Sequence, residues 1–338
     1  MATMLAVAWR AAIAGAVVVA SPSRGQVQPP PVAPAMPPVA TPPAPGTNDE
    51  TLSLRDAEPR LTVAVNIGAH GPYDFIVDTG SERTVVSGEL ANGLTLAPGP
   101  DVMVHSMTEV SRIATVILPG LRIGQRVMDP ISAPVMARQD MGAAGILGVD
   151  TLQTSRVNFD FTRREMTITP SQRSEGRWPE GTIVVTARNR FGRLMLIDAA
   201  VDGQRVRVIV DSGSEVTVAN SALRRALERR HRLGPITTIT ATSVTGGQFT
   251  ADYAVAQLIR LGDAMVARLP IAFADVHPFR QLQLIDQPAM LLGMDALRLF
   301  NRVSIDFANR QVKLVAPESL RNGAIIRSVS VNSGLPPR

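Results

Sequence analysis

Two aspartates in this chain follow the same kind of strand and precede the same kind of turn. The stretch FIVDTGSERTVV at 75–86 contains Asp78, and VIVDSGSEVTVA at 208–219 contains Asp211. Two carboxylates held in contact cannot both ionise easily, so they share a proton and provide an acid and a base at one pH. Such a pair can activate a water molecule while it protonates a carbonyl oxygen. The sequence therefore predicts that Asp78 and Asp211 face each other across one cleft.

Each aspartate is followed by three residues that suit the support of such a pair. A hydroxyl directly after the aspartate can hydrogen-bond across to the opposite turn, and the next residue, glycine, permits a tight turn and a close backbone approach. The serine after the glycine is expected to bind a carboxylate oxygen. These supporting residues are Thr79, Gly80 and Ser81 in the first turn and Ser212, Gly213 and Ser214 in the second. One such turn alone is weak evidence because similar turns occur in many loops.

The two turns belong to a longer internal repeat, which indicates a mainly β chain. Four blocks recur in the same order, namely 60–82 and 193–215, 121–124 and 259–262, 145–152 and 290–297, and 157–168 and 303–314. Apolar residues alternate before both aspartates, as at Val63, Val65 and Ile67, and this period of two is typical of half-buried strands. A duplicated β domain explains the repeat better than chance.

The composition divides the chain into segments. We expect a signal peptide at 1–20, a proline-rich linker at 21–57, lobes at 58–172 and 182–316, and a C-terminal tail at 317–338. The proline-rich segment cannot bury a core and favours extended polyproline conformations. The stretch RSEGRWPEG at 173–181 is the predicted connection between the lobes.

The N-terminal segment predicts export. Ten apolar or small residues follow Arg10 and end in Val18-Val19-Ala20, which is typical of a signal cleavage site. The run is shorter than the ~20 apolar residues that a membrane-spanning helix needs. We expect a periplasmic or secreted protein, and an uncleaved membrane anchor is the alternative.

The composition also excludes several kinds of chemistry. The chain has no cysteine, which excludes disulfides, thiol catalysis and cysteine-ligated metals, and its four histidines are widely spaced. The net charge of +5 comes almost entirely from arginine, most densely in a predicted helix at 221–233 opened by Ser221. We interpret these arginines as a solvated helix face, because no nucleic-acid-binding motif accompanies them. The prediction is therefore no cofactor, no metal and no nucleic-acid partner.

Two further aspartates follow glycine in the third repeated block. Asp150 and Asp295 stand where a short helix could start, and Asp150-Thr-Leu-Gln153 matches a capping box. We interpret both aspartates as helix caps. A metal site made of four carboxylates is the alternative, but the free backbone amides at the helix ends favour caps.

The doubled motifs resemble those of the retropepsin-like aspartic proteases. The likeness rests on IVDTGS at 76–81 and IVDSGS at 209–214, followed downstream by ILGVD at 146–150 and LLGMD at 291–295. It spans roughly residues 58–316, and it is strongest to exported bacterial proteins that contain such domains. Retroviral relatives build the aspartate pair from two identical chains, whereas this chain looks like two such lobes fused.

The resemblance carries expectations for fold and activity. It implies two acid-protease β-barrel lobes in a pseudo-two-fold arrangement, a monomer, and an aspartic-type endopeptidase acting on a peptide or protein substrate. Catalytic roles pass to Asp78 and Asp211, and the inter-turn hydroxyl roles pass to Thr79 and Ser212. The resemblance also implies β-hairpin flaps over the cleft.

Two segments are the candidate flaps by their position. The first is VHSMTEV at 104–110, with Ser106 and Met107 near its tip, and the second is 241–253, with Gly246 and Gly247 at the tip. Two glycines suit a hairpin turn. The first segment lacks both glycine and a flap tyrosine, so it departs from the pattern of pepsin-like relatives.

Two alternatives to an intramolecular protease remain at this point. The same pair of lobes could bind an extended peptide by strand addition without hydrolysing it. The lobes could also pair between two chains, in which case the active site would form only in a dimer.

Overall fold

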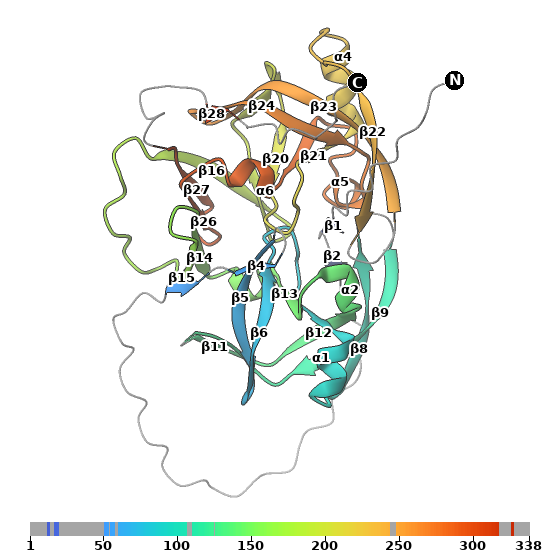
Figure 1. Cartoon of the computed structure of the whole chain (residues 1–338), viewed down its shortest axis with the longest axis vertical. Coiled ribbons are helices and arrows are strands. Elements are labelled where there is room, and N and C mark those ends of the chain that lie inside the picture. The colour runs from blue at the N-terminus through green and yellow to red at the C-terminus, as the bar shows by residue number, and fades with distance from the viewer. Residues whose placement is uncertain are drawn as a thin grey trace, which may run out of the picture.

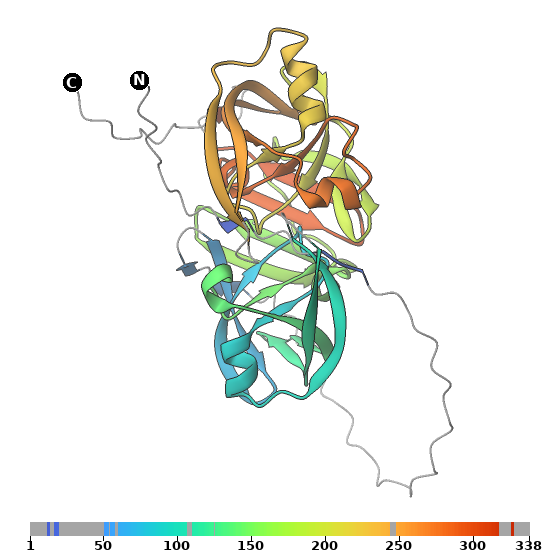
Figure 2. The same cartoon turned by 90° about the vertical axis from the view of Figure 1, so that its right-hand side faces the viewer.

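The structure is a computed structural model that describes residues 12–13, 17–19, 51–53, 55–57, 60–106, 110–124, 126–243, 248–317 and 326–327. Two β-rich lobes lie one above the other, the N-terminal lobe in blue to green and the C-terminal lobe in yellow to red (Figures 1 and 2). The prediction of a mainly β chain with two lobes is confirmed. No helix of the described residues is long and apolar enough to cross a membrane.

The N-terminal lobe is organised around the strand that ends at Asp78. Strand β5 (Arg60–Ile67) pairs antiparallel with β6 (His70–Val77), and β13 (Gly145–Leu147) runs parallel to β6 on its other side. Val63, Val65 and Ile67 of β5 are buried, as their alternation predicts. The remaining elements are β7 (Val85–Ser87), α1 (Gly88–Gly93), β8 (Pro98–His105), β9 (Val110–Leu118), β10 (Leu121–Ile123), β11 (Arg126–Met128), β12 (Ile131–Met136), α2 (Arg138–Met141) and α3 (Val149–Leu152).

The C-terminal lobe repeats this arrangement around Asp211. Strand β20 (Arg207–Val210) ends at the aspartate, and β25 (Ala289–Leu292) runs parallel to it, as β13 does to β6. The other elements are β17 (Arg193–Leu196), β18 (Ala199–Val201), β19 (Gln204–Arg205), β21 (Val218–Ala219), α4 (Ser221–Glu228), β22 (Thr237–Ser243), β23 (Gln248–Leu261), β24 (Ala264–Phe273), α5 (His277–Gln281) and α6 (Met294–Leu297).

One antiparallel sheet takes strands from both lobes. Its order is β3 (Thr51–Ser53), β15 (Glu165–Pro170), β14 (Ser155–Asp160), β26 (Arg302–Asp306), β27 (Gln311–Val315) and β16 (Ile183–Arg190). At the centre β14 faces β26, with Arg156 opposite Asp306 and Asp160 opposite Arg302. By the internal repeat, Arg156 is equivalent to Arg302 and Asp160 is equivalent to Asp306, so the two pairs are related by symmetry. The local pseudo-two-fold axis therefore passes between β14 and β26.

Each lobe carries a long hairpin at the position predicted for a flap. The first consists of β8 and β9, and the second of β22 and β23. Ser106 directly follows β8 and is buried. Met107, Gly246 and Gly247 lie outside the described residues. We call these two elements the flap hairpins from here on.

Short strands near the ends of the chain add to the lobes. Strand β1 (Ala12–Ile13) pairs in parallel with β22, and β2 (Val17–Val19) pairs antiparallel with β8, so both border a flap hairpin. Strand β4 (Arg55–Ala57) pairs with β5, and β28 (Ile326–Arg327) pairs with β24.

Three predicted helix starts are corrected by the structure. The N-cap of α4 is Asn220, whose side chain accepts a hydrogen bond from the Leu223 N–H, so the expected cap at Ser221 is one residue late. This helix ends at Glu228. The N-caps of α3 and α6 are Gly148 and Gly293, which leaves Asp150 and Asp295 inside the first turns of these helices rather than at their caps.

Candidate active site

The two repeated aspartates lie together between the lobes. Asp78 follows β6 and Asp211 follows β20, and their side chains are 0% and 1% exposed. Each is fixed by the neighbouring parallel strand, because the Asp78 N–H donates to the Leu147 carbonyl and the Asp211 N–H donates to the Leu292 carbonyl, both at 3.0 Å. The two carboxyl groups are within hydrogen-bonding reach of each other. Both aspartates come from one chain.

Thr79 and Ser212 tie the two turns to each other. The Thr79 N–H donates to Ser212 Oγ, and the Ser212 N–H donates to Thr79 Oγ1, both at 3.1 Å. The same hydroxyls donate onward into the strands of the opposite lobe, Thr79 Oγ1 to the Val210 carbonyl at 3.0 Å and Ser212 Oγ to the Val77 carbonyl at 2.7 Å. All four buried bonds join one lobe to the other, so both lobes together fix the relative position of the two turns.

Glycine brings the backbone of each turn against the carboxylate of the other lobe. A Cβ atom at Gly80 would overlap the carboxylate of Asp211, and one at Gly213 would overlap that of Asp78. Backbone amides also support the acids, since the Gly80 N–H donates to Asp78 Oδ1 at 2.8 Å and the Gly213 N–H donates to Asp211 Oδ1 at 3.2 Å. Only glycine allows this approach from the opposite lobe.

The two serines that follow the glycines contribute differently from the prediction. The Ser81 N–H donates to Asp78 Oδ1 at 3.0 Å, while the Ser81 hydroxyl donates to the Arg83 carbonyl at 2.8 Å. The Ser214 hydroxyl likewise donates to the Val216 carbonyl at 3.1 Å. These hydroxyls therefore shape the turns, and in the first turn it is the backbone amide that reaches the carboxylate.

Burial and mutual repulsion favour the protonated form of this pair. Burial, followed by the charge of Asp211, raises the pKa of Asp78 well above its ordinary value. Burial raises the pKa of Asp211 to about 6, against the opposing effect of the nearby Arg193. Asp78 Oδ2 is buried and has no hydrogen-bond partner among the described residues. Near neutral pH a pair of this kind shares one proton and carries one negative charge between its two carboxyls.

A second pair of aspartates braces the turns from behind. Asp150 accepts from the Thr84 N–H at 2.9 Å and from the Thr84 hydroxyl at 2.8 Å. Asp295 does the same for Thr217, at 2.9 Å for the N–H and 2.7 Å for the hydroxyl. Both acids therefore bind the strand that leaves each aspartate turn, a role that the capping-box pattern did not reveal.

Arg193 is a member of the site that the sequence interpretation missed. It begins β17, its side chain is 1% exposed, and it lines a small pocket together with Gly80 and Asp211. The repeat offered a signal, because Arg-Leu opens both of the blocks at 60–82 and 193–215. Glu82 lies within the reach of this charge, which opposes the effect of burial on the pKa of Glu82.

Two histidines meet across the lobes beside the site. His105 ends β8 of the first flap hairpin and His277 begins α5 of the C-terminal lobe, and their Nδ1 and Nε2 atoms lie 2.5 Å apart. Burial, followed by Arg193, lowers the pKa of His105, whereas burial, His105 and Arg280 lower that of His277. The contact therefore favours neutral rings, one donating and one accepting.

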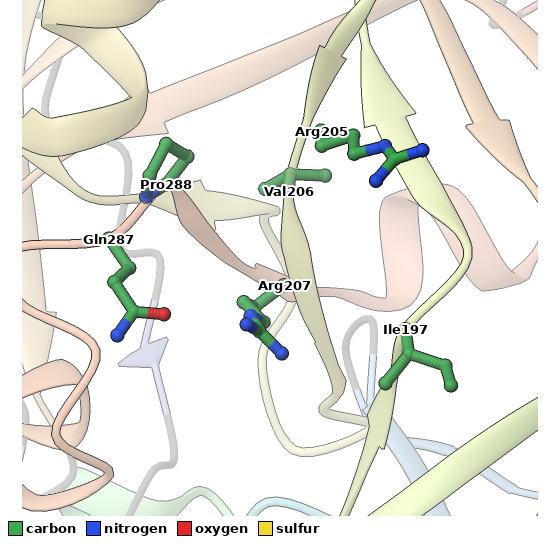
Figure 3. A pocket seen from close by; sticks show the side chains of 6 residues that line it. All are labelled: Ile197, Arg205, Val206, Arg207, Gln287 and Pro288. Atoms are coloured by element: carbon green, nitrogen blue, oxygen red, sulfur yellow. The ribbon is translucent and has the colours of Figure 1, made fainter.

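A separate hollow opens on the C-terminal lobe away from the aspartates. It has a volume of roughly 290 Å³, and Figure 3 shows the side chains around it. The lining residues are Ile197, Arg205, Val206, Arg207, Gln287 and Pro288. None of these residues belongs to the repeated turns at 78–81 and 211–214.

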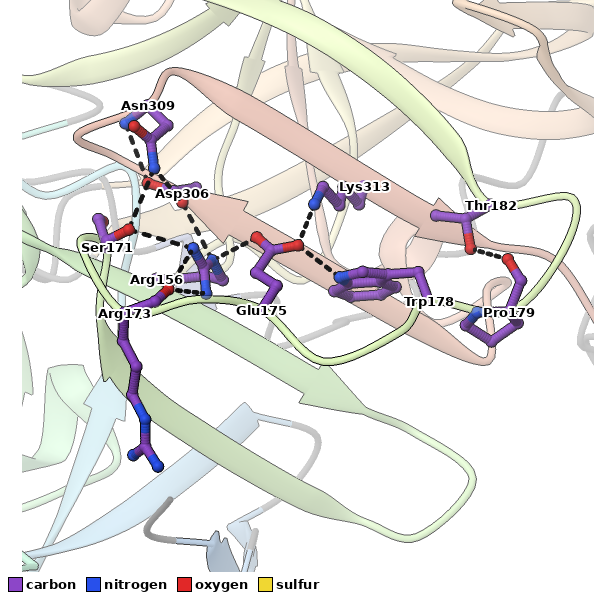
Figure 4. Close-up of polar contacts among 10 residues, drawn as sticks. All are labelled: Arg156, Ser171, Arg173, Glu175, Trp178, Pro179, Thr182, Asp306, Asn309 and Lys313. Atoms are coloured by element: carbon purple, nitrogen blue, oxygen red, sulfur yellow. Dashed lines mark hydrogen bonds and ion pairs between the residues drawn. The ribbon is translucent and has the colours of Figure 1, made fainter. Parts of the chain in front are cut away.

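The shared sheet fixes the lobes through a buried ionic cluster (Figure 4). Arg156 Nε lies 3.0 Å from Asp306 Oδ2 and 2.6 Å from Glu175 Oε1, and its side chain is 7% exposed. Glu175 also pairs with Lys313 and accepts from the Trp178 ring N–H. Glu175 and Trp178 belong to the segment predicted to connect the lobes, so this connection is packed onto the sheet.

Comparison with protein families assigns both halves of the chain. A family model described as a gag-polyprotein putative aspartyl protease matches residues 63–154, and one described as an aspartyl protease matches residues 197–296. A search of curated proteins gave no match. Each matched range contains one of the paired aspartates, its turn and the parallel strand that pins it. The chain therefore belongs to the retropepsin-like aspartyl proteases, with two protease lobes in tandem.

Proposed function

We propose that this chain is an aspartic endopeptidase that hydrolyses peptide bonds with water activated by Asp78 and Asp211. The observation that carries the proposal is the buried carboxyl pair, whose shared turns are cross-braced by Thr79 and Ser212. A buried pair of this kind costs stability, because burial disfavours ionisation of both groups. Such perturbed acids in a cleft are typical of catalytic sites.

The charges around the pair favour one assignment of the two roles. We assign Asp78 as the acid, since the charge of Asp211 adds to burial in raising its pKa, and Asp211 as the base, since Arg193 opposes the effect of burial on its pKa. Asp211 takes a proton from a water molecule while the oxygen of that water bonds to the scissile carbonyl carbon. Asp78 gives its proton to the carbonyl oxygen. The carbon–nitrogen bond of the resulting gem-diol then breaks as Asp211 gives its proton to the leaving nitrogen and Asp78 takes a proton from one gem-diol hydroxyl. The products are an amine and a carboxylic acid, and the pair is back in its starting protonation state. Water alone is consumed.

The flap hairpins suggest how a substrate would be held. Strand β1 pairs with β22 and β2 pairs with β8, which shows that one strand of each hairpin accepts a further strand. An extended peptide added to such edges gains backbone hydrogen bonds and places alternate side chains on opposite faces. The expected substrate is thus an extended segment of a peptide or protein.

The test is the loss of peptide cleavage on replacement of either aspartate. Asp78→Asn and Asp211→Asn should each retain the fold and lose cleavage of a peptide library, because neither variant can hold one proton and one charge on two carboxyls. Asp263→Asn is the matched control, since Asp263 is exposed in the turn between β23 and β24. Cleavage at the wild-type rate by either dyad variant would refute the assignment. Peptide binding without cleavage at any pH would favour the non-catalytic binding module.

A further inference from the structure

The guanidinium of Arg193 is buried without a partner. Its side chain is 1% exposed, and Nε, Nη1 and Nη2 all lack a hydrogen-bond partner within the part of the chain that the structure describes. A guanidinium carries five N–H donors and stays charged in proteins. Buried charges are ordinarily paired and hydrogen-bonded, because an unpaired one costs several kcal/mol. An orphaned arginine at this depth therefore needs an explanation.

Arg193 lies beside the carboxyl pair rather than in the core of its lobe. It lines a small pocket with Gly80 of the N-terminal turn and Asp211 of the C-terminal turn. The other walls are apolar, from Ile209, Pro278 and Leu291. Arg193 and Asp211 are the polar side chains of this pocket, which lies at the junction of the two turns.

The nearby acids balance the charge of Arg193 without satisfying its donors. Asp78, Asp211 and Glu82 all act on it electrostatically and favour its charged form. The amides of the aspartate turns already hold one oxygen of each carboxyl, and Glu82 Oε1 accepts from Gln281 Nε2 at 3.4 Å. The five donors therefore have no hydrogen-bond partner among the described residues, although they lie beside the carboxyl pair on which a substrate would be bound.

We propose that Arg193 is a specificity-determining residue that binds a carboxylate of the peptide substrate. This inference deepens the proposed function and rests on it. A planar guanidinium matches a carboxylate by two parallel hydrogen bonds, which neutral backbone carbonyls cannot provide. The carboxylate belongs either to an acidic side chain of the substrate or to its free C-terminus, and the two sources are separable by experiment.

The cleavage assay compares three forms of one apolar peptide. The first carries Glu, scanned through each position, with an amidated C-terminus; the second carries Gln at the same positions, also amidated; the third is the Gln peptide with a free C-terminus. The enzymes are wild type, Arg193→Met, Arg193→Lys and Arg188→Met. Arg188 is the matched control, since it is exposed on the adjacent strand β16, opposite Met195 of β17.

Wild type and Arg188→Met should cleave one of the carboxylate-bearing peptides with a kcat/KM about tenfold or more above that of the amidated Gln peptide, as a charge-assisted pair implies. Arg193→Met should cleave all three peptides with one kcat/KM, and that value should lie below the wild-type value on the amidated Gln peptide, because loss of the Arg193 charge raises the pKa of Asp211 further. Arg193→Lys should keep part of the preference. A preference for the Glu peptide identifies a side-chain carboxylate, and one for the free C-terminus identifies the terminal carboxylate.

Two cleavage results would overturn the proposal. One is a wild-type enzyme that cleaves all three peptides equally. The other is an Arg193→Met enzyme that loses activity on all of them by the same factor, because a purely structural role predicts that result. If Arg193→Met does not fold, Arg193→Lys decides, since it keeps the charge and removes the fork.

A binding measurement separates this inference from the proposed function. In an Asp78→Asn background, fluorescence anisotropy with the same labelled peptides should show tighter binding of the carboxylate peptide, and Arg193→Met should abolish the difference. If wild type cleaves nothing but this selective binding persists, the proteolytic proposal fails and the role of Arg193 stands. If wild type cleaves peptides without any charge preference, the proteolytic proposal stands and the proposed role of Arg193 fails.

Discussion

Thr79 and Ser212 exchange hydrogen bonds across the two lobes, each backbone N–H donating to the hydroxyl of the other at 3.1 Å. The carboxyl pair thus stands on a support that neither lobe makes alone. Because all four bonds of this support are buried, loss of a single hydroxyl leaves donors and acceptors that water cannot reach.

Removal of one of these hydroxyls should therefore destabilise the whole chain. We expect Ser212→Ala to lower the free energy of unfolding by about 1–3 kcal/mol, since the Thr79 N–H and the Val77 carbonyl both lose a partner. Urea denaturation measures the change. Ser212→Thr is the control, because threonine occupies the same place in the first turn, and it should remain close to wild type. Equal stability of the alanine and threonine variants would contradict this view of the turns.

The glycine of each turn predicts an effect that crosses between the lobes. In Gly80→Ala the new methyl group overlaps the carboxylate of Asp211, so peptide cleavage should fall by about 10²-fold or more, as displaced catalytic groups do. Gly93→Ala is a fair comparison, because a Cβ there meets nothing within 4 Å. Steady-state kinetics with circular dichroism would reveal whether activity is lost in a folded chain. Normal activity of Gly80→Ala would show that the carboxylates can move apart without harm.

The rate should fall in acid, unlike that of a protease adapted to low pH. Because the pKa of Asp211 is about 6, this base becomes protonated as the pH drops below that value, and kcat/KM should then fall tenfold per pH unit. A pH–rate profile of wild type tests this expectation. A rate that keeps rising between pH 6 and pH 4 would contradict it.

Stability should change in the opposite direction with pH. A carboxyl whose pKa is raised in the folded state contributes stability that is fully present below its unfolded pKa of about 3.9 and is lost as pH rises through the folded value. Wild type should therefore lose stability between about pH 4 and pH 7, and Asp211→Asn should lose less of it. Urea denaturation of both proteins across this range gives the comparison.

Contact between His105 and His277 predicts a pH-dependent flap hairpin. Both pKa values are lowered, so the contact is intact above the ordinary histidine value and is lost as pH falls through the lowered ones, when two charged rings repel. Hydrogen exchange in β8 and β9, corrected for intrinsic rates, should be faster at pH 5 than at pH 7.5. In His277→Phe it should be fast at both. His70→Gln, at an exposed position, should behave as wild type.

The shared sheet offers two related arginines with unequal burial. Arg156→Met removes the guanidinium that is buried against Asp306 and Glu175, and should cost about 3 kcal/mol of unfolding free energy. In the pseudo-symmetric pair, Arg302 Nε lies 3.7 Å from Asp160 Oδ2, and the Arg302 side chain is 38% exposed. Arg302→Met should therefore cost about 1 kcal/mol or less. Chemical denaturation of the two variants compares them directly. Equal losses would mean that burial does not govern these pairs.

Local patterns in the sequence were sufficient for the strands and for the turns. Alternation at Val63, Val65 and Ile67 predicts the buried face of β5, because a strand presents every second side chain to one side. The repeat predicts that Asp78 and Asp211 occupy equivalent positions, and two equivalent lobes leave few other ways to place them. Helix starts were less certain, since Asn220 and Ser221 are both good caps and only tertiary contacts decide between them.

Contacts between distant elements could not be predicted in this way. Arginine is ordinarily a surface residue. Arg193 is buried because the turn of the other lobe, at Gly80, and helix α5, at Pro278, both lie against it. His105 and His277 are separated by 172 positions, and both lie outside the four repeated blocks. Asp150 resembles a helix cap in sequence and accepts from the Thr151 N–H in the first turn of α3, but it also accepts from the N–H and the hydroxyl of Thr84, which lies next to it only in the folded lobe.

The crossed position of Gly80 and Gly213 also limits how the two halves of a duplicated gene can diverge. A side chain at Gly80 would collide with the carboxylate of Asp211, which belongs to the other half of the chain. A mutation in one half therefore disturbs the aspartate of the other half. Such halves cannot drift independently at these positions, however different their flap hairpins and outer surfaces become.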